Sequence, residues 1–283
     1  MPPGTPPPWL STLAFAVLGL MVVALWTFGG RLLHGLPAVE PRRRRPVPWG
    51  GEGALLAGFY LVCAALSLAA SVNDEAAPTG DLRLSGAVLQ LLSQLAFAAI
   101  AVAVLIARYP TRGLTWGDLG LGDLPRKLAG DVGLGVLACM AMLPFVYGAN
   151  YVLVLLFGNP TLHPAIESLL HDSDWESLLS IGLVASVGAP LFEELAFRVL
   201  LQGGLERIGG RRATWPIVAS SLAFALAHTN QGYAPVPIAV LALGLGYVYR
   251  QTHSYPAVVA MHVTFNSLSL AVVVGQGQLV PAP

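Results

Sequence analysis

Long apolar stretches, separated by short polar or proline-rich connections, follow one another along the chain. Scanned with a window of about 19 residues, the width that detects membrane helices, the sequence predicts eight helices. They cover residues 9–32, 54–72, 84–107, 131–157, 175–205, 214–227, 236–249 and 257–274. The pattern therefore predicts an all-α, polytopic membrane protein with about eight transmembrane helices.

The composition supports a membrane protein. Hydrophobic residues make up 55% and charged residues 11% of the 283 residues, and the mean hydropathy is +0.68. A soluble domain carries about 25% charged residues. The apolar run 9–28 has no basic residue before it and no small-residue cleavage site after it, so we expect a spanning helix rather than a removed signal peptide.

The distribution of charge predicts the topology. Lys+Arg and Asp+Glu number 15 each, so the net charge offers nothing to a polyanion and argues against a nucleic-acid partner. The connections 42–45, 108–127 and 206–212 are basic, whereas 73–83 and 162–176 are acidic. The positive-inside rule then predicts a multi-pass protein of the cell membrane with the basic loops in the cytoplasm and both termini outside.

Two of the basic connections allow a second interpretation. The run 42–45 suits a lipid headgroup or a nucleic acid, but a topology signal explains it more simply. The glycine-rich stretch 113–121 follows no strand and has no Lys-Ser/Thr pair, which argues against a phosphate loop. We expect an interfacial segment anchored by Trp116.

The residues Glu193, Glu194 and Arg198 lie deep inside the apolar run 178–205. Each such charge at mid-membrane costs about 2.5–3.5 kcal/mol, so we expect these side chains to have partners. Glu194 and Arg198 have the i, i+4 spacing of a helical ion pair. Glu193 is turned about 100° away, which leaves it free to act as a general base. Pro190 should kink this helix.

A purely structural ion cluster, one that only locks helices together, would also account for these three charges. Two later helices add polar residues: His228 ends one, and His262 and Asn266 share a face of the last. A single membrane histidine is often only a hydrogen bond between helices. Because polar groups in lipid need partners, we expect Glu193, His228, His262 and Asn266 to converge.

These motifs resemble the CAAX-protease and bacteriocin-processing (CPBP) family of intramembrane proteases. The resemblance rests on Glu193-Glu194-x-x-x-Arg198, Phe224-x-x-x-His228 and His262-x-x-x-Asn266, with support from Leu119-Gly120-Leu121. It covers about residues 175–274. Many relatives have Gly after the motif arginine, where this chain has Val199.

The resemblance implies a role for each motif residue. Glu193 and His228 would activate water, His262 and Asn266 would hold the oxyanion, and Glu194 with Arg198 would order the site. It implies an endopeptidase with a protein or peptide substrate at the membrane, working within the lipid bilayer. The catalytic core would span residues 130–283, and 1–129 would supply N-terminal transmembrane helices and cytoplasmic loops.

Metal dependence stays open on the residues alone. His228, His262 and Glu193 would supply the three ligands of a catalytic zinc ion, as the term metalloprotease, used for this family, implies. The chain has no His-Glu-x-x-His run, and asparagine is a poor zinc ligand. A metal-free mechanism centred on glutamate is the alternative.

Two other classes of function compete with the protease. A non-catalytic peptide-binding or immunity protein of the same fold would be expected to lose a motif residue, and this chain keeps each of them. A proton-coupled transporter would be expected to show broken helices in both halves. Here the intramembrane polar residues gather in the C-terminal half.

Overall fold

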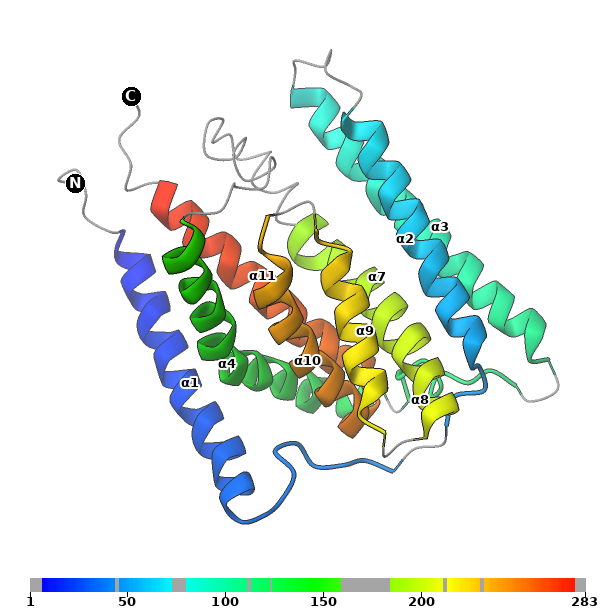
Figure 1. Ribbon diagram of the computed structural model, residues 1–283, viewed down its shortest axis with the longest axis horizontal. Coiled ribbons are helices and arrows are strands. Elements are labelled where there is room, and N and C mark those ends of the chain that lie inside the picture. The colour runs from blue at the N-terminus through cyan, green and yellow to red at the C-terminus, as the bar shows by residue number, and fades with distance from the viewer. Residues whose placement is uncertain are drawn as a thin grey trace.

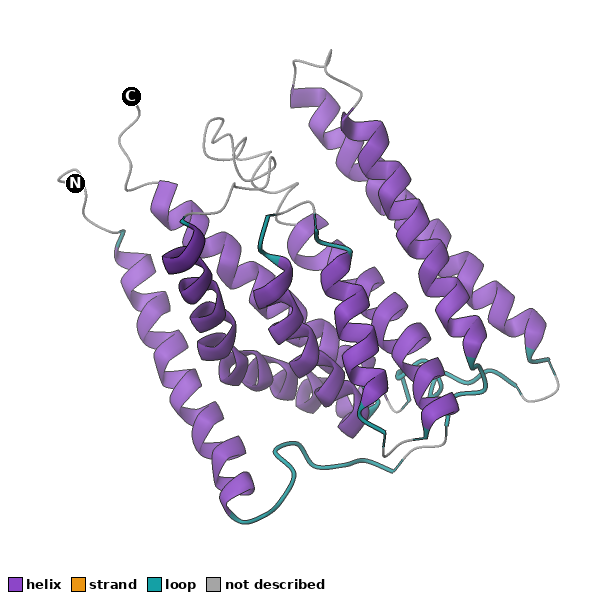
Figure 2. Ribbon diagram, viewed as in Figure 1, coloured by secondary structure: helices purple, strands orange, loops and turns teal. Residues whose placement is uncertain are grey.

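The computed structural model describes residues 7–43, 46–72, 80–110, 113–122, 124–158, 184–210, 213–229 and 232–277. Every regular element within these ranges is a helix, which confirms the all-α fold (Figure 2). The first four helices are α1 (Pro8–Leu33), α2 (Gly51–Val72), α3 (Gly80–Arg108) and α4 (Leu124–Phe157). The motif helix follows as η1 (Val184–Gly188), α7 (Ala189–Glu194), η2 (Leu195–Gln202) and α8 (Gly203–Gly209). The last three are α9 (Trp215–Leu226), α10 (Pro235–Thr252) and α11 (Tyr255–Gly277).

The eight predicted helices all have a counterpart, and the differences lie at their ends. α4 begins at Leu124 rather than at residue 131, because the hydropathy window excluded the charged first turn with Arg126 and Lys127. The predicted domain boundary after residue 129 thus falls inside α4. The start of the predicted helix 175–205 and most of the acidic loops lie outside the described residues.

Within the described residues, four helices are long and apolar enough to cross a membrane. They are Pro8–Leu33, Leu91–Arg108, Pro125–Phe157 and Tyr255–Gly275. Two shorter apolar helices, Gly51–Ala65 and Trp215–Leu226, accompany them. The outer face of α1 suits lipid, since Phe15 and Trp26 are exposed. The total of eight crossings stays a prediction, because the motif helix is divided into short segments.

The helices pack side by side around α4, α10 and α11 (Figure 1). α1 packs on α4 at one edge, and α9 packs between α10 and η2. α2 covers η2 and α8, and α3 pairs with α2 at the opposite edge. α4 bends in its middle (Figure 1), where Pro144 removes a backbone donor from the helix. The motif helix therefore lies inside the bundle.

A column of aromatic rings joins the outer hairpin to the motif helix. Phe97 of α3 packs on Tyr60 of α2 with 4.9 Å between ring centroids, and Tyr60 meets Phe197 of η2 at 6.1 Å. Phe197 in turn packs edge-on against Phe224 of α9 at 5.1 Å. Such ring pairs add about 0.5–1.5 kcal/mol each beyond the burial of their area. The column ends at the candidate site.

The contact between α2 and η2 is unusually close. Trp49, in the segment before α2, donates its indole N–H to the carbonyl of Leu200 at 3.2 Å. A Cβ added at Gly53 would collide with that same carbonyl and with the Trp49 ring. Only glycine allows α2 to approach the motif helix this closely.

Candidate active site

The motif helix changes its hydrogen-bond pattern twice near the acidic pair. Pro190 has no N–H, so the carbonyl of Ser186, four residues earlier, lacks its α-helical donor. The π-helix η1 covers Ser186, and in a π-helix each carbonyl bonds five residues ahead. The structure shows this change of pattern directly before Pro190, and the kink itself stays a prediction; the second π segment, η2, begins directly after Glu194.

A row of buried polar residues, spaced four apart, runs from the end of α7 through η2 into α8. The row consists of Glu194, Arg198, Gln202 and Glu206, which are 0%, 0%, 0% and 4% exposed.

Glu194 and Arg198 form the predicted ion pair. Arg198 donates from Nε to Glu194 Oε2 at 3.1 Å, and both side chains are fully buried. The guanidinium also donates from Nη1 to the Ser220 hydroxyl at 3.2 Å and lies 5.3 Å from the Phe224 ring centroid. Two charges in so apolar a place offset each other, and breaking such a pair costs about 3–5 kcal/mol.

His262 of α11 lies between the two acids. Its Nδ1 is 2.8 Å from Glu194 Oε1, and its Nε2 is 3.8 Å from Glu193 Oε2. The carboxylates thus face opposite nitrogens of one imidazole, rather than pointing to unrelated places as the helical wheel suggested. They differ in access, because the Glu193 side chain is 17% exposed and that of Glu194 is 0% exposed.

His228 reaches the site through the ring of Phe224. Its Nδ1 lies 2.8 Å from the Phe224 carbonyl, so Nδ1 carries the proton and Nε2 is left as the acceptor. The Phe224 ring packs on His228 at 4.9 Å and on His262 at 5.6 Å between centroids. Phe224 therefore sets the spacing of the two histidines.

Asn266 lies one turn beyond His262 on α11 and faces the start of the motif helix. Its side-chain amide donates from Nδ2 to the carbonyl of Ala185 in η1 at 2.8 Å. An amide nitrogen has two donors, so this bond fixes Asn266 and leaves a second N–H for another acceptor.

The structure thus links Arg198 to Glu194 and Glu194 to His262, with Glu193 3.8 Å from the opposite nitrogen of the His262 ring. His228 joins them through Phe224, and Asn266 joins them through η1. Sequence reasoning placed all six motif residues in one region and did not foresee that both acids meet the same histidine.

Sequence reasoning missed the rest of the polar row. The Ser220 hydroxyl donates to Gln202 Oε1 at 3.2 Å, and Gln202 Nε2 donates to Glu206 Oε1 at 2.9 Å and to the Gly246 carbonyl at 2.8 Å. Glu206 lies 3.5 Å from Arg250 Nε of α10. The signal was present as polar residues recurring every four positions from residue 194 to 206.

The residues named for zinc do not form a metal site in this arrangement. In the part of the chain that the structure describes, no group of three His, Cys, Asp or Glu side chains is placed to hold a metal ion. His262 Nδ1 is bonded to Glu194 and His228 Nδ1 to the Phe224 carbonyl. These bonds leave Nε2 of both histidines open, as in histidines that bind a metal, so the donor set lacks only the spacing of a metal site.

Comparison with known proteins supports the resemblance. Residues 175–268 match the family model described as Rce1-like, type II CAAX prenyl endopeptidase Rce1-like. The match covers about a third of the chain and contains each motif residue from Glu193 to Asn266. Searches of curated proteins and of solved structures found no match. The CPBP resemblance is thereby confirmed: the segment 175–268 is similar to the Rce1-like family.

Proposed function

We propose that the protein is an intramembrane endopeptidase of the CAAX-protease type, which hydrolyses a peptide bond of a membrane-associated protein. One observation carries the proposal: His262 is held between a fully buried carboxylate and a more accessible one. This arrangement gives the two acids different tasks, as hydrolysis by activated water requires.

Glu193 is the general base. It is the carboxylate that solvent can reach, and one of its oxygens lies 3.8 Å from His262 Nε2, too far for a direct hydrogen bond. A water or a substrate carbonyl can approach this side of the ring. The free Nε2 of His228 accepts a hydrogen bond from the same water and directs its lone pair at the carbonyl carbon.

His262 and Asn266 stabilise the oxyanion. Glu194 accepts a hydrogen bond from His262 Nδ1, which orients the ring. With a proton on Nε2 as well, the ring donates from that nitrogen to the oxyanion. The second N–H of Asn266 supplies another donor. A preorganised donor of this kind is worth about 2.7–4 kcal/mol of transition-state stabilisation.

The reaction balances with one water. Its oxygen bonds to the carbonyl carbon, and its proton passes to Glu193. When the tetrahedral intermediate collapses, the C–N bond breaks and Glu193 returns the proton to the leaving amine. The products are a new carboxyl terminus and a new amino terminus, and Glu193 is regenerated.

Cleavage in membranes tests the proposed function directly. Membrane fractions of cells that carry the wild type or Glu193→Ala are compared by quantitative mapping of new protein termini. We expect termini that depend on Glu193 and that lie at or near a membrane-associated segment. Identical terminus profiles would contradict the protease, and a peptide retained without cleavage would instead support the peptide-binding alternative.

A defined peptide tests the substrate class. We expect a prenylated peptide ending in a CAAX sequence to be cleaved, since the matched family is described as a CAAX prenyl endopeptidase. The same peptide without the prenyl group is the control. Equal cleavage of both peptides would still support the proposed protease activity but would contradict a preference for prenylated substrates.

Chelation separates the two mechanisms. A reaction that Glu193 and His228 carry out directly should keep full turnover in metal-free protein. Loss of activity after exhaustive chelation, restored by added zinc, would instead show that His228, His262 and Glu193 rearrange to bind the ion.

A further inference from the structure

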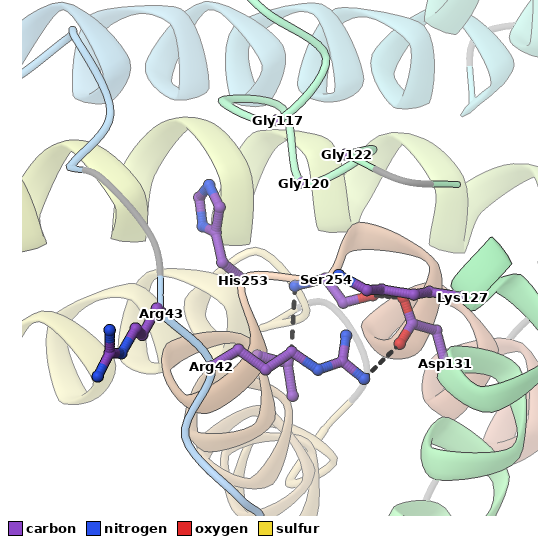
Figure 3. Close-up of a pocket in the computed structure, with 10 residues that line it drawn as sticks. Arg42, Arg43, Gly117, Gly120, Gly122, Lys127, Asp131, His253 and Ser254 are labelled. Carbon is purple, nitrogen blue, oxygen red and sulfur yellow. Dashed lines mark hydrogen bonds and ion pairs between the residues drawn. The ribbon is translucent and has the colours of Figure 1, made fainter. Parts of the chain in front are cut away.

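A pocket of ≈ 230 Å³ lies away from the acidic pair, where the segment after α1, the loop before α4 and the corner between α10 and α11 meet (Figure 3). Its lining includes Arg42, Arg43, Lys127, Asp131 and His253 together with glycines of the loop 117–122. None of these residues belongs to the proposed catalytic set.

The walls of this pocket are held by hydrogen bonds from three directions. The Arg42 amide donates to the Gln251 carbonyl at 2.7 Å, and the Ser254 hydroxyl donates to Asp131 Oδ2 at 2.6 Å. Gly120, with φ of +75°, accepts from the Tyr255 amide at 3.1 Å. A Cβ at Gly120 would meet the backbone of this corner at 2.8–2.9 Å. The pocket is therefore a fixed part of the fold.

The charge of the lining favours an anion. Among the lining residues that the structure describes, Arg42, Arg43 and Lys127 are cationic and Asp131 is a carboxylate. Asp131 is already engaged, since Arg42 Nη2 lies 2.6 Å from its Oδ1 (Figure 3). Guanidinium groups match the geometry of phosphate oxygens, and lysine adds a point charge.

The pocket lies at the level where membrane helices end. α1 and α3 end at Leu33 and Arg108, and α11 begins at Tyr255. The candidate span Pro125–Phe157 has 33 residues, whereas about 20 cross a bilayer. Its first turns, with Lys127, can therefore extend into the headgroup region. Trp116 nearby is 71% exposed, as suits an aromatic anchor in the interface.

We propose that this pocket binds a phosphate group, and that its source is the headgroup of an anionic phospholipid. The loop 113–121 is then no phosphate loop by itself. It forms one wall, while the cations come from the segment after α1 and from α4. The basic run 42–45 still serves as a topology signal, and the headgroup site is an additional role.

Native mass spectrometry of the delipidated protein in detergent tests the site, with phosphatidylglycerol or phosphatidylcholine as the added lipid. We expect phosphatidylglycerol to bind preferentially. Removing one basic contact, in Lys127→Gln or Arg43→Gln, should weaken that binding about fivefold. Arg126→Gln is the matched control, because Arg126 is adjacent and exposed but does not line the pocket. Lys127→Arg should retain binding.

Inorganic phosphate distinguishes the two sources of the group. If phosphate, at an ionic strength matched with chloride, displaces phosphatidylglycerol or alone raises the unfolding temperature in a Lys127-dependent way, the pocket binds the bare anion as well. If it does neither, the lipid is the source. Equal losses in Arg126→Gln and Lys127→Gln, or no effect of either ligand, would overturn the site. None of these measurements depends on protease activity.

Discussion

At the scale of single residues, the site depends on how one carboxylate is shared. Glu194 gives one oxygen to Arg198 and the other to His262, and it is fully buried. Among the residues that the structure describes, the Glu193 carboxylate next to it forms no hydrogen bond and approaches His262 Nε2 only to 3.8 Å. The two neighbours should therefore respond differently to the same substitution.

We expect Glu194→Gln to damage folding and Glu193→Gln to leave a folded, inactive protein. The first change leaves the Arg198 charge buried without a counter-charge, a loss of about 3–5 kcal/mol. The second change removes the proposed general base, but it leaves no buried charge without a partner, so the fold should be kept. Expression level, monodispersity in detergent and cleavage activity separate the two. Equal folding defects in both variants would contradict this division of roles.

Ser220 supports the same arginine from the neighbouring helix. Ser220→Ala removes an acceptor from Arg198 and a donor to Gln202, so we expect destabilisation of about 1–3 kcal/mol. Ser221→Ala is the matched control, because Ser221 is also buried but its hydroxyl has no hydrogen-bond partner among the described residues. Thermal unfolding of both variants gives the comparison, and a larger loss in the control would contradict the role of Ser220.

The sequence predicted the pairs that lie on one helix and missed those between helices. Glu194 with Arg198, and His262 with Asn266, follow from a spacing of four. The Glu194–His262 contact and the position of Phe224 between two histidines depend on how α9 and α11 cross the motif helix, which no local pattern encodes.

At the scale of helices, hydropathy predicted where helices exist because each must bury or expose a continuous apolar surface. It did not predict that the motif helix alternates between α and π turns. The first π segment lies where Pro190 lacks a donor, and the second begins directly after Glu194. The early start of α4 was missed for a related reason, since charged residues in the first turns lower the averaged hydropathy below the value expected of a membrane helix.

The approach of α2 to η2 provides a test at this scale. Gly53→Ala should destabilise the protein by about 1–3 kcal/mol, because its Cβ meets the Leu200 carbonyl and forces the helices apart. Gly58→Ala, in the same helix with nothing within 4 Å of its Cβ, should be neutral or slightly stabilising. Unfolding temperatures in detergent are compared. Equal unfolding temperatures for the two variants would contradict the close contact between Gly53 and the Leu200 carbonyl.

At the scale of the whole molecule, the described parts of the basic connections lie at one end of the candidate spans (Figure 1), and the positive-inside rule predicts that this end is cytoplasmic. α4 links this end to the other, from exposed Arg126 to exposed Phe157. A single cysteine at either position therefore reports on one side of the membrane.

In a background with Cys63 and Cys139 replaced by alanine, an impermeant maleimide should label Phe157→Cys on intact cells. Arg126→Cys should react only after permeabilisation. Protein extracted in detergent, where both sites should react, is the control for thiol access. The reverse pattern on intact cells would invert the topology and move the basic pocket to the outer surface.

The bond from Trp49 to the Leu200 carbonyl limits how the chain can be divided. It joins the matched segment to a residue 151 positions earlier in the sequence. Gly53 and the ring of Tyr60 press on the same helix from the same side. A fragment cut to residues 175–268 would expose an apolar groove where α2 belongs. Grafting this segment into another membrane protein would therefore also require α2 and the segment before it that carries Trp49. The part of the chain that must be transferred together is thus larger than the family match.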